Sequence, residues 1–338
     1  MPNTTVPIRA LWFSDQSWDY APQNPYEANA RYAGGILPTS ITLITWNVDY
    51  NTPNVAERLT AALDYLQFHA FPEYKGNQPP RCMILLQEIA LQAFDVLLAH
   101  PWVQAWFMVV PGSPDEGWPR DAWYGTATLV ARSVPLAESK CVHFGESYMQ
   151  RNALVTDVLL GGAEPLPRVL RVVNTHLESL PEGTKRREVQ LGTIAELLRE
   201  EETEMETEGE GEGEGETARV GGIVGGDMNA IAQSDAVLAE QNGLLDAWEE
   251  RGRWNVGVAA AAAGSSDAEE EEGTTWGYQP PCMFPPGRLD KILYTESDAF
   301  DVKGIRIVGK GLKMPGYNGW VSDHYGLLCQ VEARGAGL

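Results

Sequence analysis

The sequence predicts an α/β fold in which mixed β-sheets pack face to face and helices flank them. Short apolar runs of strand length recur along the 338 residues, and only a few segments have helical periodicity. Several of these runs are joined by connections too short for the crossover helix that parallel strands need, which argues against one doubly wound sheet. The hydrophobic content of 43%, with 11 Trp, 12 Tyr and 8 Phe, is typical of a folded globular protein.

The first third of the chain is predicted to hold a leader, two strands and two helices. Residues 1–38 are rich in Pro, Asn, Tyr and Trp without clear periodicity, so we expect an irregular N-terminal leader. The run "SITLITW" is rich in Ile and Thr, as strands are. A helix with a 3.6-residue period begins at Val55, and Asn54 is in the position to cap it. The run "RCMILLQE" predicts a strand that closes on Glu88, and residues 88–100 predict a helix.

The rest of the chain alternates further strands with one helix. The strand-like runs are "YGTATLVAR", "NALVTDVLL", "VLRVVNTHLES", "GGIVGGDMN", "RLDKILY", "IRIVGKG" and "YGLLCQVEA". Residues 185–202 have the pattern of a helix. We therefore expect a single domain over residues 39–338.

The formal net charge of −22 is concentrated in two segments. Residues 200–216 hold ten Glu and residues 267–272 hold five acids, so 22 − 15 leaves a net charge of −7 on the rest of the chain. Segments of this composition cannot bury apolar surface, and we expect acidic disordered insertions near 200–217 and 257–273. No chemical role is predicted for them. The body is mildly acidic, which bears on solubility and non-specific association.

The composition also bears on compartment. The four cysteines are far apart and have no C-x-x-C pairing, so zinc and disulfide frameworks are not expected and reduced thiols fit best. The first residues lack a secretory signal, and no apolar run reaches the roughly 20 residues that span a bilayer. The sequence predicts a soluble, intracellular protein with no membrane partner.

The motif "GGIVGGDMNA" ends a predicted strand on Asp227 and Asn229. Residues two apart on a strand point to the same face, so these two side chains should project together, beside glycines that allow close approach to the backbone. The same residue types are common in turns, so the motif alone has an ordinary structural explanation.

Polar side chains end the other predicted strands as well. They are Asn47 and Asp49, Glu88, His176 and Ser179, Asp227 and Asn229, and Asp323 and His324. Taken singly, each has an ordinary explanation as a turn or solvated residue. Together they suggest one shared cleft, because strand ends are where scaffolds present chemical groups.

This set of side chains is rich in oxygen and contains no cysteine, which suits Mg²⁺ or Mn²⁺. Glu88 is the predicted direct ligand. Asp227 is predicted to orient and deprotonate a water, while Asn229 and a protonated His donate hydrogen bonds to a phosphoryl group. Asp290, inside a strand-like run, is predicted to orient His324. The chain has no G-x-S-x-G, P-loop or H-E-x-x-H motif, which removes several rival chemistries.

The ordered motifs "TWN-x-D", "QE", "THLES", "GD-x-N", "RLD" and "SDH" resemble the metal-dependent endonuclease/exonuclease/phosphatase superfamily over residues 41–332. Within it, "LLQEIA", "DAWEE", "TTWGY" and "SDHYGLLC" are most similar to the 5′-tyrosyl-DNA phosphodiesterase branch. The resemblance implies a four-layer α/β sandwich, with the site at one edge of the paired sheets.

The resemblance also implies residue roles. Glu88 would bind Mg²⁺, Asp323 would reach the metal through water, and Asn47 and Asp49 would share the pocket. Asp227 would activate water beside Asn229, and His176 and His324 would contact the phosphate, with Asp290 steadying His324. Tyr124 and Ser179 would line the groove, and Trp276 would offer a flat wall to a terminal nucleotide or would be a core residue.

Three positions depart from the pattern of the branch. Ile231 replaces a basic residue two positions after "GD-x-N", Gly125 is smaller than expected, and Leu289 stands where an aromatic would widen contact with a base. These departures leave the hydrolytic residues intact and bear on the substrate.

The function we expect is Mg²⁺-dependent hydrolysis of a 5′-phosphotyrosyl bond on a DNA end by a monomeric repair enzyme, in the nucleus by family resemblance. The alternatives are a general nuclease, an RNA deadenylase, an inositol or phospholipid phosphatase, or a binding module that retained the fold without catalysis.

Overall fold

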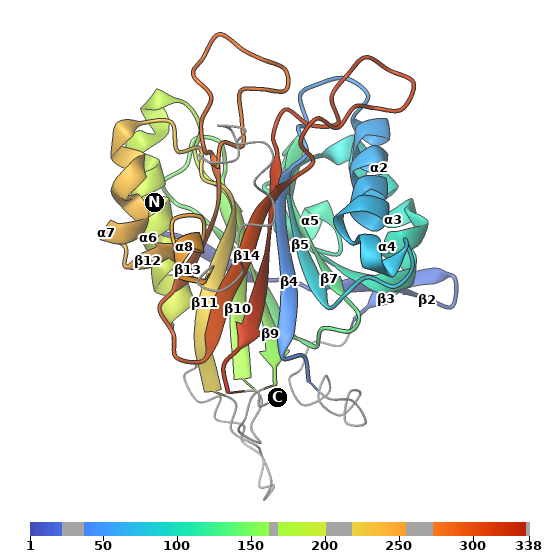
Figure 1. Ribbon diagram of the computed structural model, residues 1–338, viewed down its shortest axis with the longest axis horizontal. Coiled ribbons are helices and arrows are strands. Elements are labelled where there is room, and N and C mark those ends of the chain that lie inside the picture. Colours follow the sequence, from blue (N-terminus) through green and yellow to red (C-terminus); the bar gives the residue numbers. More distant parts are fainter. Residues whose placement is uncertain (22–36, 162–167, 201–217, 255–272, 336–338) are drawn as a thin grey trace, which may run out of the picture.

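A computed structural model of the protein describes residues 1–21, 37–161, 168–200, 218–254 and 273–335. Two β-sheets pack face to face, and helices cover the outer face of each sheet (Figure 1). The predicted four-layer α/β sandwich is confirmed. Both predicted acidic insertions fall almost entirely outside these ranges. Within the described ranges, no helix is long and apolar enough to cross a membrane.

One sheet has seven strands in the order β1-β8-β9-β10-β11-β13-β12. The strands are β1 Thr4–Pro7, β8 Leu136–His143, β9 Asn152–Leu160, β10 Arg168–His176, β11 Ala218–Asp227, β13 Asp290–Thr295 and β12 Leu244–Asp246. Only β10 and β11 are parallel neighbours, and the other pairs are antiparallel.

The other sheet has eight strands in the order β14-β15-β4-β5-β7-β6-β2-β3. They are β14 Phe300–Val308, β15 Gly326–Ala333, β4 Ser40–Asn47, β5 Cys82–Ala90, β7 Tyr124–Ala131, β6 Phe107–Val110, β2 Leu11–Ser14 and β3 Ser17–Tyr20. Here β4 and β5 are the parallel pair. Both sheets are therefore mixed, as the short connections predicted.

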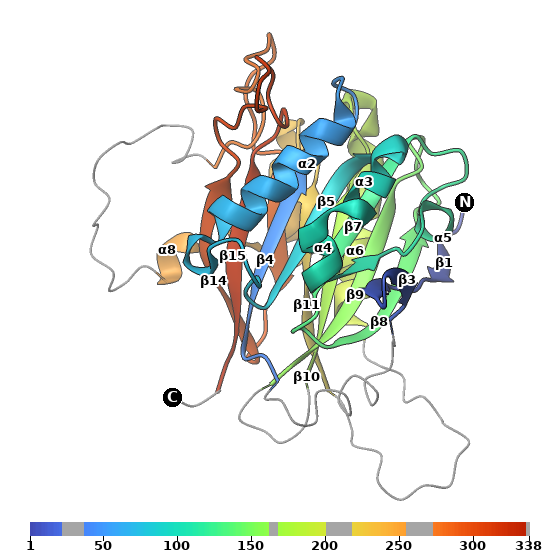
Figure 2. The ribbon, with the colours of Figure 1, turned by 90° about the vertical axis from the view of Figure 1, so that its right-hand side faces the viewer.

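Helices α2 (Val55–Tyr65), α3 (Phe94–Ala99) and α4 (Pro101–Trp106) lie on the outer face of the eight-stranded sheet (Figure 2). Helices α6 (Thr184–Arg199) and α7 (Leu238–Gln241) cover the seven-stranded sheet (Figure 1). Single turns complete the set: α5 Pro114–Gly117, α8 Arg251–Trp254, a π-helical turn Leu66–Ala70, and 3₁₀ turns at Pro72–Tyr74, Leu91–Ala93, Pro181–Gly183 and Gln233–Val237.

The leader differs from the expectation of irregular structure. Its described part forms β1, which extends the seven-stranded sheet, and β2 and β3, which extend the eight-stranded sheet. These strands have four residues each and are mostly exposed or half-buried. Edge strands this short carry no alternation long enough to be read from sequence.

Two local predictions were wrong. Asn54 precedes α2 with φ of 64° and makes no side-chain capping bond, because a left-handed residue does not aim its side chain at the first turn. The helix predicted over 88–100 starts later: β5 continues to Ala90 against β7, a 3₁₀ turn follows, and α3 begins at Phe94.

The facing surfaces of the two sheets fit closely below the edge that carries the predicted site. Strand β4 is buried from Ile41 to Asn47 because both of its faces are covered, which explains its continuous apolar run. A Cβ added to Gly225 on β11 would lie 2.8 Å from Leu85 Cδ1 of the other sheet. The close approach predicted for this glycine is therefore made by the facing sheet.

A buried polar bridge also joins the sheets. Gln87 on β5 donates from Nε2 to Asn174 Oδ1 on β10 at 2.8 Å, and Asn174 Nδ2 donates to the carbonyl oxygen of Leu86 at 3.1 Å. Both side chains have no exposed surface. Unpaired buried amides would cost about 1–3 kcal/mol each, so these bonds favour one alignment of the sheets just below the strand ends.

Candidate active site

Six strand-end side chains meet at one edge of the sandwich. The paired ends of β4 and β5 supply Asn47 and Glu88, and the paired ends of β10 and β11 supply His176 and Asp227. Asp290 opens β13 directly opposite Asp227, and His324 lies just before β15. The structure therefore brings together the six residues at the centre of the predicted site. Residues from motifs that are far apart in the sequence thus form one cluster, to which both sheets contribute.

Asp227 lies at the centre of this cluster and is 2% exposed. Its Oδ2 accepts a hydrogen bond from Asn47 Nδ2 of the opposite sheet at 3.0 Å, and its Oδ1 accepts one from the backbone N–H of Asn229 at 2.8 Å. Burial alone would raise the pKa of Asp227, but His324, His176 and these hydrogen bonds lower it below its usual value. Asp227 is therefore ionised at neutral pH.

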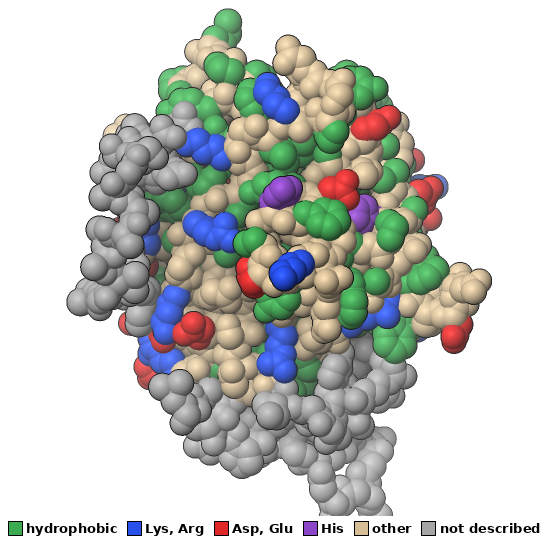
Figure 3. All heavy atoms as spheres, turned by 45° about the vertical axis from the view of Figure 1, so that its right-hand side comes forward, with side chains coloured by type: hydrophobic (Ala, Val, Ile, Leu, Met, Phe, Trp, Pro, Cys, Tyr) green, Lys and Arg blue, Asp and Glu red, His purple; other side chains and the backbone are tan. Residues whose placement is uncertain are grey.

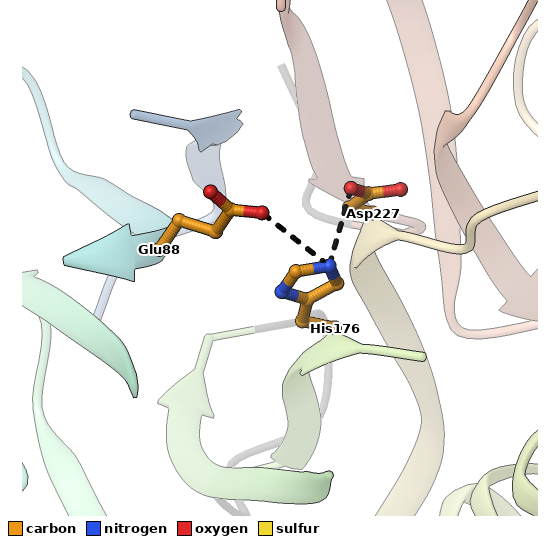
Figure 4. A group of neighbouring side chains, drawn as sticks. All are labelled: Glu88, His176 and Asp227. Carbon is orange, nitrogen blue, oxygen red and sulfur yellow. Dashed lines mark ion pairs between the residues drawn. The ribbon is translucent and has the colours of Figure 1, made fainter. Parts of the chain in front are cut away.

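Glu88 faces Asp227 from the other side of the cleft, and Figure 4 shows both pointing toward His176. A β-bulge between Leu86 and Ile89 interrupts the pairing of β5 with β7, and Glu88 within it has φ of 59°. Bulges re-aim side chains near active sites, and this one turns Glu88 into the cleft. Its Oε2 accepts a hydrogen bond from the backbone N–H of Tyr50 at 3.1 Å.

The Glu88 carboxylate carries an unfavourable charge in the absence of a cation. Burial, with Asp227 and Asp323 nearby, raises the pKa of Glu88 to about 7 despite the opposing effect of His324. Ligand atoms of Glu88, His176 and Asp227 lie within 4.8 Å of one another. Two carboxylates in this small space fit a hard divalent cation, which would relieve their repulsion.

His176 is neutral and acts as a hydrogen-bond donor. Arg151 Nη1 lies 3.0 Å from His176 Nδ1, and since a guanidinium only donates, Nδ1 accepts and the ring proton is on Nε2. That Nε2 lies 3.4 Å from Asp227 Oδ2 and 3.8 Å from Glu88 Oε1. Burial and then Arg151 lower the pKa of His176 well below its usual value. Its Nε2–H therefore serves as a donor rather than as a metal ligand.

His324 has the opposite charge state. Its Nδ1 lies 2.7 Å from Asp290 Oδ2, and its Nε2 lies 3.8 Å from Asp227 Oδ2. Burial would lower the pKa of His324, but Asp290, Asp227 and Asp323 together raise it well above its usual value. The expected role of Asp290, which is itself fully buried, matches this contact. His324 is an imidazolium directed at the cleft.

The backbone around His324 is fixed by three buried side chains. Trp46 Nε1 donates to the carbonyl oxygen of His324 at 3.0 Å, and Ser322 Oγ donates to that of Asn47 at 2.6 Å. Arg58, 1% exposed, donates to the carbonyl oxygen of Val321 at 2.8 Å. The loop that carries His324 is thereby tied to β4 and α2.

Arg58 also changes the interpretation of Asp49. The Asp49 Oδ2 accepts from Arg58 Nη1 at 3.1 Å, and its Oδ1 accepts from the backbone N–H groups of Asn51 and Thr52. Asp49 is 6% exposed. Its carboxylate is thus committed to the turn after β4, which it organises. A direct role for Asp49 in the pocket that it was expected to share with Asn47 remains a prediction.

Asn229 and Ser179 follow Asp227 and His176 in the sequence, and their side chains are not among the six that meet in the cluster. Asn229, with φ of 46°, donates from Nδ2 to the carbonyl oxygen of Leu177 at 3.0 Å, which uses one of its two amide protons. Ser179 is half-buried, three residues beyond His176. Their contacts with phosphate remain predictions.

Asp323 and Trp276 form the rim of the site. Trp276 is half-buried, and its Nε1 donates to Asp323 Oδ2 at 3.1 Å. The other Asp323 oxygen lies 4.0 Å from His324 Nε2. Burial chiefly raises the pKa of Asp323. Trp276 is therefore a rim residue held by Asp323, and its stacking on a base remains a prediction.

A cavity of about 300 Å³ opens beside His176. Tyr124 and Tyr50 stack there with ring centroids 3.8 Å apart, and the Arg151 guanidinium lies 5.5 Å from the Tyr124 centroid and donates to its hydroxyl at 2.9 Å. Trp123 and Tyr148, 78% and 79% exposed, line its mouth. The expected place of Tyr124 beside the site is consistent with this cavity.

Sequence reasoning did not find Arg151 or Tyr50. Arg151 immediately precedes β9, and the first residue of an antiparallel strand lies at the same edge as the last residue of its neighbour. This rule applied to β9 and β10 would have suggested Arg151. Tyr50 had no such signal, since its ring contact with Tyr124 and its backbone hydrogen bond to Glu88 both arise from tertiary packing.

Glu178 is a further residue that was passed over. Its carboxylate, 2% exposed, accepts from Ser147 Oγ at 2.7 Å, from the backbone N–H groups of Tyr148 and Met149, and from Gln190 on α6. These bonds hold the loop that leads to Arg151.

The three departures have structural consequences. A Cβ on Gly125 would lie 2.3 Å from the Trp118 ring, so this position must be small here. Leu289 is 5% exposed and belongs to the packed interior. Ile231 is 45% exposed on the loop after Asn229, and it puts an apolar side chain where the branch has a cation.

Two sheets that bring carboxyl groups, one neutral and one charged imidazole and a carboxamide to a single cleft define a phosphodiesterase-type hydrolase with a place for a divalent cation. The chain belongs to the Endonuclease/Exonuclease/phosphatase family, whose profile matches residues 44–324. No curated protein matches the chain.

Solved structures with the same fold include TDP2 proteins. TDP2 from D. rerio in complex with a single-stranded DNA product is 20% identical, with a TM-score of 0.59 over 87% of this chain and 99% of that one. Truncated TDP2 from Caenorhabditis elegans gives the same identity and TM-score over 87% and 98%. The human Nocturnin catalytic domain with bound sulfate is 19% identical, with a TM-score of 0.51 over 88% and 96%. These likenesses confirm the fold expected from the motifs.

Proposed function

We propose that the protein is a Mg²⁺-dependent phosphodiesterase that hydrolyses 5′-phosphotyrosyl bonds on DNA ends and acts in DNA repair in the nucleus, with Mn²⁺ as a possible substitute. The observation that carries the proposal is the position of the aromatic cavity. It shares His176 with the hydrolytic cluster, and it joins the Tyr50–Tyr124 stack to the Arg151 guanidinium.

This cavity suits an aromatic leaving group. A phenol ring is bound by offset stacking on other rings and by a cation over its face, and Tyr124 and Arg151 offer both. The DNA side of the substrate would then lie toward Trp276 and Ile231. The single-stranded DNA product bound to the similar D. rerio TDP2 supports a nucleic-acid substrate.

The residues support in-line hydrolysis. Bound at Glu88, Mg²⁺ would polarise the phosphate and neutralise its charge. Asp227 Oδ2 accepts a proton from a water whose oxygen forms a bond to phosphorus, while the bond from phosphorus to the tyrosyl oxygen breaks. The His324 imidazolium and the His176 Nε2–H donate to the phosphoryl oxygens as their negative charge grows. The products are a 5′-phosphate and a tyrosine hydroxyl, the latter after proton uptake.

The test is cleavage of a 5′-tyrosyl oligonucleotide with Mg²⁺, with Mn²⁺ and with EDTA. We expect cleavage with either metal, none with EDTA, and none by Asp227→Asn. A panel of poly(A) RNA, unmodified DNA, an inositol phosphate and a phospholipid tests specificity. Faster cleavage of any panel substrate than of the tyrosyl oligonucleotide would contradict the proposed substrate. No cleavage of the oligonucleotide or of any panel substrate would contradict the proposal that the protein is an enzyme.

A further inference from the structure

The connection between β14 and β15 contains a small hairpin next to the active site. Val321 donates its backbone N–H to the carbonyl oxygen of Leu312 at 3.1 Å, and Met314 donates to that of Gly319 at 3.0 Å. Met314 and Val321 are buried in the core, at 5% and 0% exposed. The alternate positions face outward, as strand geometry requires, and they carry Lys313 and Trp320.

The base of this hairpin is rigid and continuous with the catalytic loop. Gln279, 1% exposed, donates to the carbonyl oxygens of Ser322 at 3.0 Å and His324 at 3.1 Å, and its Oε1 accepts from the N–H of Gly311 at 2.9 Å. Trp320 is separated from Asp323 by only two residues. The hairpin is therefore attached directly to the loop that carries His324.

The charge of the hairpin differs from that of the chain. Residues 309–322 include Lys310 and Lys313 and no Asp or Glu, and residues 273–289, which lead to and follow Gln279, also contain no acid. The whole chain has 47 acids among 338 residues. In Figure 3, hydrophobic and uncharged side chains cover most of the upper end of the molecule, with isolated Lys or Arg and isolated Asp or Glu among them. The acid-free hairpin itself suits an anionic partner.

The outward face also offers aromatic rings. Lys313 Nζ lies 3.0 Å from the centroid of the Trp320 ring, and Tyr317 at the tip of the hairpin is 59% exposed. A lysine paired with exposed aromatic rings is the combination that binds single-stranded nucleic acid, because the cation contacts phosphate and the rings stack on bases. An acidic peptide would use the lysine and leave the rings without a role.

We infer that the hairpin of residues 312–321 binds the single-stranded segment of the nucleic acid whose end occupies the active site. Lys313 contacts a phosphate and Tyr317 stacks on a base. This inference rests on the proposed function only in taking a nucleic acid as the substrate.

The test compares binding with catalysis in the full chain. Binding of a 12-nucleotide 5′-phosphorylated DNA strand is measured by fluorescence anisotropy in EDTA at several salt concentrations. Hydrolysis of thymidine 5′-(4-nitrophenyl) phosphate with Mg²⁺ reports on the catalytic site alone, since this ester is too small to reach the hairpin. The variants are Lys313→Glu, Lys313→Arg and Tyr317→Ala. Lys75→Glu is the matched control, because Lys75 is exposed after the 3₁₀ turn Pro72–Tyr74, on the chain that leads into the start of β5.

We expect Lys313→Glu to lower the slope of log affinity against log salt by about 0.7 and Tyr317→Ala to weaken binding by about 5- to 150-fold. Lys313→Arg and Lys75→Glu should bind like the wild type, and every variant should hydrolyse the small ester at the wild-type rate. Equal binding by Lys313→Glu and Lys75→Glu, with no effect of Tyr317→Ala, would overturn the inference. The inference would also be overturned if a poly-Glu peptide of equal charge displaced the DNA and Tyr317→Ala did not weaken DNA binding. If Lys313-dependent binding occurs without any hydrolysis, the proposed function fails and the binding surface stands.

Discussion

Two histidines flank the same carboxylate from opposite sheets, and they differ in charge. His176 at the end of β10 and His324 before β15 place Nε2 at 3.4 Å and 3.8 Å from Asp227 Oδ2. Burial lowers the pKa of both rings. The difference arises at the other ring nitrogen, where His176 meets the Arg151 cation and His324 meets the Asp290 anion.

This comparison shows that the partner of Nδ1, which faces away from Asp227, sets the charge of each ring and therefore its role at the cleft. The neutral His176 donates one proton without adding charge, next to a cavity suited to an uncharged ring. The charged His324 stabilises negative charge that builds up on phosphate. The site therefore has one cationic and one neutral side. The predictions below concern the carboxylate that the two rings share, the cationic side, the metal ligand and the neutral side.

Replacement of the shared partner should have the largest effect. Asp227→Asn removes the base and the carboxylate between the two imidazoles, so we expect kcat to fall about 10³-fold or more. The isosteric amide has one acceptor oxygen and keeps one of the two hydrogen bonds that Asp227 accepts, so we expect a small fall in the thermal unfolding midpoint with the fold retained. Wild-type rates in steady-state cleavage assays would refute the assigned base.

Replacement of Asp290, the anion behind His324, should have the second-largest effect on rate. Asp290→Asn removes the charge that contributes most to raising the pKa of His324, and we expect kcat to fall about 10²-fold at neutral pH. A raised pKa keeps His324 charged through neutral pH, and activity is lost as pH rises through that pKa. In the variant this alkaline loss should move to lower pH, and an unshifted pH–rate profile would contradict the charge assigned to His324.

Metal affinity should depend on pH through Glu88. Because the pKa of Glu88 is about 7 in the metal-free protein, a cation must displace a proton below that pH. We expect Mg²⁺ affinity, measured by titration calorimetry, to fall about tenfold per pH unit between pH 7 and pH 5 and to level off above pH 8. Glu88→Gln should bind weakly at every pH, and pH-independent wild-type affinity would exclude Glu88 as the ligand.

Loss of the cation behind His176 should have the smallest effect on rate. The effect should be specific for substrates with an aromatic leaving group. Arg151→Met removes the cation near Tyr124, and we expect kcat/KM for an ester with an aryl leaving group to fall about fivefold more than for a matched alkyl ester. The pKa of His176 should also rise, since Arg151 lowers it. An equal loss with both esters would mean that Arg151 acts on structure alone.

The sequence predicted the groups that face the cleft better than the groups behind them. Asn47, Glu88, His176 and Asp227 each end an apolar run, and parallel pairing aligns such ends at one edge, so local pattern was sufficient. Arg151 and Tyr50 come from loops whose contacts depend on tertiary packing. The pairing of β9 with β10 would have placed Arg151 at the correct edge of the sheet, but its contacts, like those of Tyr50, are not specified by a local pattern.

The same limit applies to the fold. Long strands buried on both faces, such as β4 and β9, were predicted because their apolar runs are continuous. The four-residue strands β1, β2 and β3 were missed because pairing with a sheet edge stabilises them, whereas their composition does not indicate strands. Glu88 sits in a bulge with a left-handed backbone, where its aim depends on the mismatch between two strands.

The two imidazoles around Asp227 are expected to differ in charge. Nitrogen chemical shifts of the five histidine rings in metal-free protein at pH 7 would reveal this difference, with His176→Gln and His324→Gln assigning the two signals. We predict a neutral ring with its proton on Nε2 for His176 and a doubly protonated ring for His324. The same charge state for both rings, or the reverse assignment, would contradict this account of the site.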